Sequence, residues 1–435
     1  MTAFRLLLSF CLLTALAGCQ LEKRTDTPDT PPVAATSNDA TVYGGYEPEP
    51  TDADIEAARR YDSWRGFARR DTEYPRSLGR PVTSDSARAD SSGTAMRRDR
   101  NRPLRADTTA YASALKLPLA GDAGGQSVLY TQIMLDRAGF SPGQIDGKWG
   151  QNTEKAIYWL QRSEGMDATG RLDRRTLRRL AQMADAPRSP DSLLVAYTLT
   201  GADVEGPFEE VPDDIYAQAE MEELGYENLG EKLGEQFHVA PTLLREWHGG
   251  ALDSLAAGDT LRVPNLRQQN LGGVDRIVVS DGGRYLHALD AQGRIVYHFP
   301  ATLGADYDPS PTDTLEVTSV TENPGWHYQP KILADVDDSE EDAQIPPGPN
   351  NAVGTVWMAL SKEHYGIHGT AHPATIGHTA SAGCVRLTNW DAQTLGRHVG
   401  EGTEVAFRDT DGRDPMRNRP ASADSTASDS TAVRP

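Results

Sequence analysis

Large apolar residues are unevenly distributed along the 435 residues of the chain. They are sparse in residues 19–121, which are rich in Pro, Thr, Ser, Asp and Arg, and again in residues 410–435. Segments of this composition cannot bury enough apolar surface to offset their conformational entropy. We therefore predict a disordered tether over 19–121, a disordered tail over 410–435, and ordered domains between them.

The first ordered block, residues 122–184, has helical periodicity. Positions at helical spacing are Thr153, Ala156, Ile157 and Leu160. They predict an amphipathic helix with Asn152 as its N-cap. A further helical face, carrying Leu177 and Leu180, follows Asp173.

The second block, residues 193–266, predicts a strand, two short helices and a closing strand. An acidic insertion over 201–227 separates the first strand from the helices. The third block, residues 272–409, is mostly β. Short β-branched runs at 275–281, 284–290 and 293–300, with glycine turns between them, predict a strand meander. Further strands are predicted within 314–321, 354–360 and 404–409, and one helix within 389–400.

The start of the chain has the pattern of an export signal. Arg5 precedes a short apolar run that cannot span a bilayer and suits a secretory signal over 1–18. The run ends in Leu16-Ala17-Gly18-Cys19, which resembles the bacterial lipobox. That resemblance implies a lipidated Cys19, and Gln20 after it implies the outer membrane facing the periplasm. The alternative is an ordinary secretory cleavage in which Cys19 is incidental.

The formal net charge is −20. Binding to nucleic acids or anionic membranes needs clustered positive charge, so we expect neither kind of partner through charge. The predicted membrane association depends on the lipid alone.

Cys384 is the remaining cysteine once Cys11 leaves with the signal and Cys19 is capped. An unpaired cysteine in an oxidising export compartment is more often catalytic than structural. The alternative is a buried free cysteine, which the flanking Gly383 disfavours. His368 lies upstream and could activate the thiol.

Each neighbouring residue suggests a chemical role. His368 would take the thiol proton and return it to a leaving amine, while the thiolate forms a thioester with an amide carbonyl. Gly383 allows a tight turn, so the amides of Gly383 and Cys384 could form an oxyanion hole. Arg386 suits a substrate carboxylate or a structural salt bridge. Ser381 is either a hydrogen-bond donor to substrate or a turn residue.

Residues 345–360, 365–370 and 381–392 resemble the L,D-transpeptidases, the cysteine enzymes that cross-link or edit bacterial peptidoglycan. The family signature is a histidine-glycine pair followed by serine-x-glycine-cysteine-x-arginine. Its residues correspond to His368, Gly369, Ser381, Gly383, Cys384 and Arg386. Ala382 departs from the second histidine that many members have there. The resemblance implies a mostly-β catalytic domain over 272–409, no cofactor, and an imidazole oriented by a carbonyl near Gly369. Tyr365 and Trp357 either line the substrate groove or pack in the core.

The other two blocks also resemble known modules. Segments 145–153 and 169–177 are similar to the small three-helix peptidoglycan-binding domain. Residues 255–264 match the closing pattern of a lysin-motif (LysM) module, which implies an α+β fold for 193–266; the insertion departs from its compact form. The fold class predicted is thus multidomain.

Additional histidines near the signature are His364, His372 and His378. Their spacing does not match a zinc site, and we predict no metal. The acidic stretch 334–344 lies where the family carries a lid over the groove, or is a solvated loop.

The sequence therefore predicts a lipid-anchored L,D-transpeptidase of the cell envelope. Its partners would be peptidoglycan glycan and stem peptides. The acyl acceptor would be a stem amine (a 3→3 cross-link), a protein lysine or a D-amino acid. Water as acceptor would make it an L,D-carboxypeptidase or cross-link hydrolase. A non-catalytic wall-anchoring protein is the other alternative, which Cys384 and His368 argue against.

Overall fold

A computed structural model describes residues 108–408, except 251, 267–270, 281, 283, 306–308 and 333–338. The predicted signal, Cys19, most of the tether and the whole predicted tail lie outside these residues, as does part of the acidic stretch 334–344. The described residues all fall within one contact unit. No helix among them is long and apolar enough to cross a membrane.

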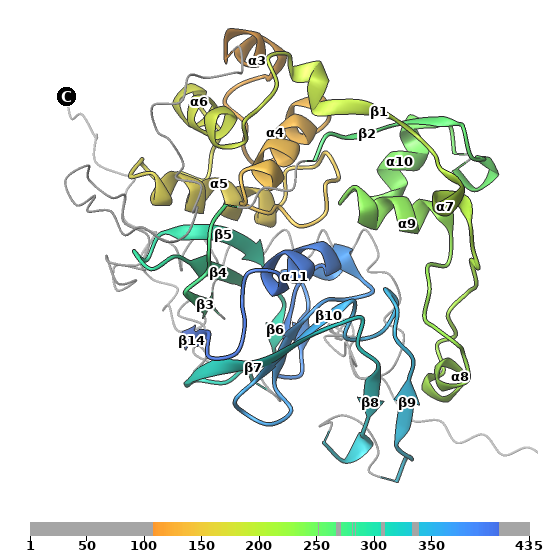
Figure 1. The fold of residues 1–435 in the computed structure, drawn as a ribbon. Coiled ribbons are helices and arrows are strands. Elements are labelled where there is room, and N and C mark those ends of the chain that lie inside the picture. Colours follow the sequence, from red (N-terminus) through yellow and green to blue (C-terminus); the bar gives the residue numbers. More distant parts are fainter. Residues whose placement is uncertain are drawn as a thin grey trace, which may run out of the picture. The chain divides into compact units, whose positions relative to one another are not determined.

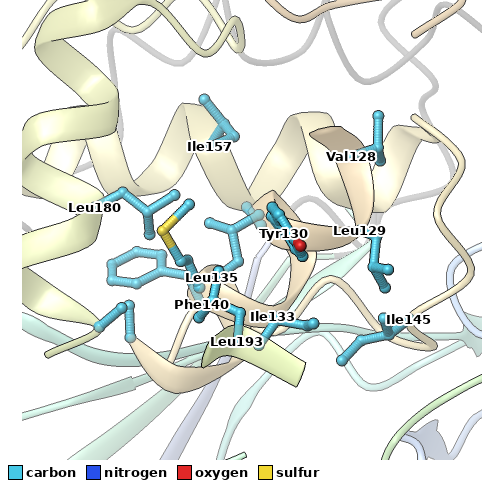
Figure 2. Close-up of a cluster of buried hydrophobic side chains, with 14 of the residues drawn as sticks. Val128, Leu129, Tyr130, Ile133, Leu135, Phe140, Ile145, Ile157, Leu180 and Leu193 are labelled. Carbon is cyan, nitrogen blue, oxygen red and sulfur yellow. The ribbon is translucent and has the colours of Figure 1, made fainter. Parts of the chain in front are cut away.

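The first block folds as helices around an apolar core (Figure 1). The helices are α3 (Thr108–Ala114), α4 (Gln126–Arg137), α5 (Gln151–Ser163) and α6 (Arg174–Met183). Figure 2 shows how side chains such as Ile133, Ile157 and Leu180 meet in this core. Asp173 caps α6 through the backbone N–H of Thr176, because an N-cap carboxylate satisfies an unpaired amide of the first turn. The expected N-cap Asn152 is instead inside α5, which begins after Gly150.

The tether boundary at residue 121 is wrong at its C-terminal end. Helix α3 lies within the expected tether, and Tyr111, Leu115 and Leu119 are buried in the core of the first block. Tyr111 lies on α3, whereas Leu115 and Leu119 follow the helix and Leu119 forms a β-bridge with Leu172, so the polar composition of the longer segment concealed an ordered end. The Tyr111 hydroxyl donates to the carbonyl of Pro187 at 3.2 Å.

Replacing Tyr111 with alanine should lower the free energy of unfolding by about 3 kcal/mol, because a fully buried aromatic ring is removed. Urea unfolding followed by circular dichroism measures this loss. Ser113→Ala, an exposed site on the same helix, is the matched control and should change stability by less than about 0.5 kcal/mol. Equal stability of Tyr111→Ala and the unmodified chain would show that α3 does not belong to the core.

The second block has the predicted order of strand, helices and strand. Strands β1 (Leu194–Thr198) and β2 (Thr260–Pro264) pair antiparallel, and between them lie α9 (Leu229–Gln236) and α10 (Pro241–Trp247). The insertion carries two further short helices, α7 (Gly201–Val204) and α8 (Ile215–Ala219). The apolar core of this block is continuous with that of the first block and includes Tyr285 and Val278 of the third.

The third block contains an eight-stranded sheet among the described residues. Its strand order is β13 (Val385–Arg386), β11 (Gly366–His368), β10 (Val356–Leu360), β7 (Thr314–Glu322), β14 (Glu404–Arg408), β3 (Arg276–Ser280), β4 (Tyr285–Leu289) and β5 (Ile295–Pro300). The predicted meander β3-β4-β5 is confirmed, and so is the single predicted α-helix, α11 (Asn389–Gly396). Helix α11 contacts β10, and α5 contacts β5.

A small hairpin projects from the third block toward the insertion. Strands β8 (Trp326–Tyr328) and β9 (Ala343–Ile345) pair antiparallel, and β9 includes the last two residues of the acidic stretch. Helix α8 packs on β9, as Figure 1 shows, in a separate apolar cluster with Ile215 and Leu224 on one side and Tyr328 and Ile345 on the other. The Tyr216 hydroxyl contacts the backbone of Glu341 at 3.0 Å. The described part of the acidic stretch is therefore held by the insertion.

Candidate active site

The sheet topology brings the two halves of the signature together. Strand β11 ends at His368, and β13 begins directly after Cys384. The two short strands run parallel, with Ile367 opposite Val385 and His368 opposite Arg386. Extended by one residue, this register places Cys384 opposite Gly366 at the start of β11, two residues before His368 on the same strand.

The turn before Cys384 has the geometry that its sequence predicts. Gly383 has φ 81°, a left-handed conformation that residues with a side chain rarely adopt. The Ser381 hydroxyl is buried and donates to the carbonyl of Cys384 at 2.5 Å. Ser381 thus stabilises the turn, and its role as a substrate contact stays a prediction. The half-buried thiol of Cys384 lies 3.6 Å from the carbonyl oxygen of His364.

His368 is buried and its ring orientation is defined. Its Nδ1 lies 2.7 Å from the carbonyl oxygen of Gly369, and because a carbonyl only accepts, Nδ1 carries the proton. Nε2 is then the basic nitrogen. Burial and next the positive charge of Arg386 lower the pKa of His368 to about 3, although the bond to Gly369 opposes the shift. At neutral pH the imidazole is uncharged and able to accept a proton.

Trp357 contacts the site histidine. From the sequence, this residue was predicted only to line the groove or to pack in the core. Its indole stacks on the His368 ring with centroids 5.4 Å apart and an interplanar angle of 26°. A Cβ on Gly366 would lie 2.5 Å from the indole, so this glycine leaves the space for the stack. The contact arises because β10 pairs with β11 and sets Trp357 opposite His368. No sequence pattern within either strand predicts it.

The remaining predicted residues border this centre. Arg386 is half-buried and its charge acts on both His368 and His372. Burial and Arg386 lower the pKa of His372 to about 4. Tyr365 is half-buried against the sheet core, with the ammonium of Lys362 4.0 Å from its ring centroid. Tyr365 therefore packs against the core, as one alternative predicted, and its side chain is also partly exposed near the site.

A buried amide connects three segments behind His368. The Oδ1 atom of Asn389 accepts from the backbone N–H groups of Thr355 and Thr370, each at 3.1 Å. Its Nδ2 donates to Glu235 Oε1 at 2.7 Å and to the carbonyl of Pro349 at 3.1 Å. A Cβ on Gly369 would lie 2.1 Å from Asn389 Oδ1, so only glycine fits at this position. Gly369 thus supports the site through its backbone.

The first block also contacts the loop that joins the two halves of the signature. Asn152 of α5 donates from Nδ2 to the carbonyl of Ile376 at 2.8 Å. Gly377 follows at φ 82°, where a Cβ would lie 2.5 Å from Asn152 Oδ1. Asn152, expected to cap a helix, therefore links α5 to the segment between His368 and Cys384.

In the described part of the chain, no three His, Cys, Asp or Glu side chains gather closely enough to hold a metal ion. What remains at the centre is a thiol, a neutral buried imidazole and the backbone amides of a glycine turn. This is an arrangement for nucleophilic catalysis.

Comparison with known proteins agrees with this geometry. Residues 274–406 match the L,D-transpeptidase catalytic domain, and residues 124–180 match a peptidoglycan-binding domain. YkuD of Bacillus subtilis, whose name assigns it to the L,D-transpeptidases, is 29% identical over 40% of this chain and 90% of its own. Its namesake in Bacillus licheniformis is 31% identical over 35% of this chain and 76% of its own.

A solved L,D-transpeptidase from Xylanimonas cellulosilytica (residues 123–326) is 13% identical, with a TM-score of 0.30 over 67% of this chain and 97% of that one. This similarity is too weak to add to the assignment. The family assignment follows from the sequence relatives, because the Bacillus licheniformis protein is 31% identical and is matched over 76% of its length. The chain belongs to the L,D-transpeptidase family.

Proposed function

We propose that this protein transfers acyl groups between peptidoglycan stem peptides through a thioester on Cys384. The observation that carries the proposal is the pairing of β11 with β13, which brings the segment of Cys384 next to the strand of His368, a buried, neutral imidazole whose Nδ1 is held by the Gly369 carbonyl. Such an imidazole presents Nε2 as a general base. The peptidoglycan-binding domain supports a wall substrate, because it would raise the local concentration of stem peptides.

The steps follow from the positions of these groups. His368 Nε2 takes the thiol proton, and Cys384 Sγ bonds to the carbonyl carbon of the diamino acid at position three of the donor stem. The amides of Gly383 and Cys384 stabilise the oxyanion. The C–N bond to the terminal D-Ala then breaks, and the imidazolium gives its proton to the leaving amine. An acceptor amine attacks the thioester, His368 takes its extra proton, and the thiolate leaves.

Incubating the purified protein with sacculi and profiling the muropeptides tests this function. We expect loss of tetrapeptide stems with release of D-Ala and gain of either 3→3 cross-linked dimers or, with an added D-amino acid, exchanged tetrapeptides. Conversion to tripeptides alone would show that water is the acceptor and that the enzyme is a carboxypeptidase. Binding to sacculi without any change in muropeptides would favour the wall-anchoring alternative.

The pH dependence of acylation follows from the low pKa of His368. Because the neutral form is the base, a pKa of about 3 keeps the imidazole competent far below its usual titration near pH 6.5. The rate of acylation by a carbapenem, followed as a mass shift on Cys384, should therefore show no inflection between pH 5 and pH 7 that belongs to His368. Carbapenem stability without enzyme is the control at each pH. A tenfold fall centred near pH 6.5 would contradict a neutral buried imidazole.

The lipid anchor and the LysM assignment are further parts of the proposal. We propose that Cys19 carries lipid on the periplasmic side of the outer membrane, as the lipobox-like sequence supports. Apart from the insertion with α7 and α8, the β-α-α-β order of 193–266 supports a LysM-like module that binds glycan or spaces the catalytic domain. Fractionation of cells expressing Cys19→Ser tests the anchor, since that variant should leave the membrane fraction.

A further inference from the structure

A glutamate of the second block contacts the catalytic domain directly behind its histidine. Glu235 lies near the end of α9, outside residues 274–406 that match the catalytic domain. Its Oε1 accepts from Asn389 Nδ2 at 2.7 Å, across 154 positions of sequence. The Tyr226 hydroxyl is also hydrogen-bonded to this carboxyl. The contact is thus a polar link between two blocks that the sequence separates.

Asn389 can hold only one orientation. Its side chain is fully buried and uses two acceptor and two donor positions, which is the full capacity of an amide. Backbone N–H groups of Thr355 and Thr370 only donate, so the amide oxygen must face them and the NH₂ group must face Glu235. Without an acceptor at position 235, one buried N–H would lose its partner, which is unfavourable.

The amide acts on the catalytic histidine through one peptide unit. The N–H of Thr370, held by Asn389, and the carbonyl of Gly369, which accepts from His368 Nδ1 at 2.7 Å, belong to the same peptide group. Holding the N–H end of this group therefore orients and polarises its carbonyl end. Consecutive hydrogen bonds of this kind strengthen one another.

Burial raises the pKa of Glu235 to about 8, with a smaller contribution from Glu231. The carboxyl is therefore largely protonated at neutral pH and adds little charge behind the imidazole. An uncharged acceptor is all that Asn389 requires, so glutamine should replace this glutamate with little change.

We propose that Glu235 is a positioning residue for His368: through Asn389 and the Gly369–Thr370 peptide it holds the imidazole in the orientation that presents Nε2 to Cys384. The second block is then part of the active site's support as well as a module beside it. Only the kinetic test of this inference rests on the proposed function.

The test uses the full chain with Glu235→Ala, Glu235→Met and Glu235→Gln. Loss of the acceptor should lower kcat for acyl transfer about tenfold at unchanged KM, since small misplacement of a catalytic group slows the reaction. In Glu235→Gln, kcat should stay within about twofold of that of the unmodified chain, because the acceptor for Asn389 is kept and the histidine is not misplaced. Lys232→Ala is the matched control, because Lys232 lies on the same helix and bonds to the carbonyls of Ala202 and Glu205, away from Asn389.

A nitrogen-15 NMR spectrum of the histidine rings gives a readout that does not depend on turnover. The His368 resonances, identified by their loss in His368→Ala, should shift in Glu235→Ala and Glu235→Met and stay in place in Glu235→Gln and Lys232→Ala. Circular dichroism at the assay temperature establishes that each variant is folded, and Met keeps the side-chain volume if Ala does not fold. Unchanged resonances and kcat in both apolar variants would overturn the proposal. If the unmodified chain transfers no acyl group, the proposed function fails, while the spectrum still decides the role of Glu235.

Discussion

Cys384→Ala should abolish acyl transfer, lowering the rate by at least roughly 10³-fold, because no other group at the site can form the thioester. The turn that carries the residue is held by the Ser381 hydroxyl and the left-handed Gly383, neither of which depends on the thiol. The half-buried sulfur contacts the His364 carbonyl only weakly, at 3.6 Å. The fold should therefore survive, with a stability change below about 1 kcal/mol.

Chromatography of muropeptides after incubation with sacculi measures this loss. Cys384→Ser is the matched control, since it keeps a similar side-chain shape with a poorer nucleophile, and it should also be inactive. Both variants should sediment with sacculi as well as the unmodified protein does, because the matched peptidoglycan-binding segment lies elsewhere in the chain. Persistent transfer by Cys384→Ala would exclude the thioester mechanism.

His368→Ala should lower the rate of acylation by about 10²–10⁴-fold, the usual contribution of a positioned general base. The effect belongs to the chemical step, so binding of the donor should change little. Stopped-flow mass spectrometry with a carbapenem separates the rate of thioester formation from the affinity of the initial complex.

Removing a buried ring that stacks on Trp357 also weakens packing, and a control must separate the two effects. His368→Gln keeps more of the volume and lacks the base, so it should be as inactive as His368→Ala and more stable. Recovery of activity in His368→Gln would mean that the ring serves packing and that another group takes the thiol proton.

Much of the site could be predicted from the sequence. The lone Cys384, the left-handed Gly383 and the histidine-glycine pair are local features whose chemistry depends on residue type and spacing. Six longer strands of the third block were also predicted, since β-branched runs are typical of strands, but the short strands β11 and β13 beside the site were not. Helix α3 was missed because it is short, buries only Tyr111 and lies at the end of a long polar segment.

The contacts behind the histidine could not be predicted. Asn152 was expected to cap α5, yet it donates to the carbonyl of Ile376. Trp357 meets His368 only because β10 and β11 pair in one particular register. Glu235 is an ordinary helix residue by pattern, and its bond to Asn389 exists because α9 contacts α11.

The sequence by itself predicted a nucleophile, its base, the glycine turn between them and most kinds of secondary structure in each block, because these predictions use residue types and short spacings. The tertiary structure alone decided that the three blocks share apolar cores and that α5 and α9 each contribute a hydrogen bond to the segments around His368 and Cys384. Such contacts join residues more than a hundred positions apart. They are set by how whole helices pack on the sheet, and no periodicity within a segment encodes them.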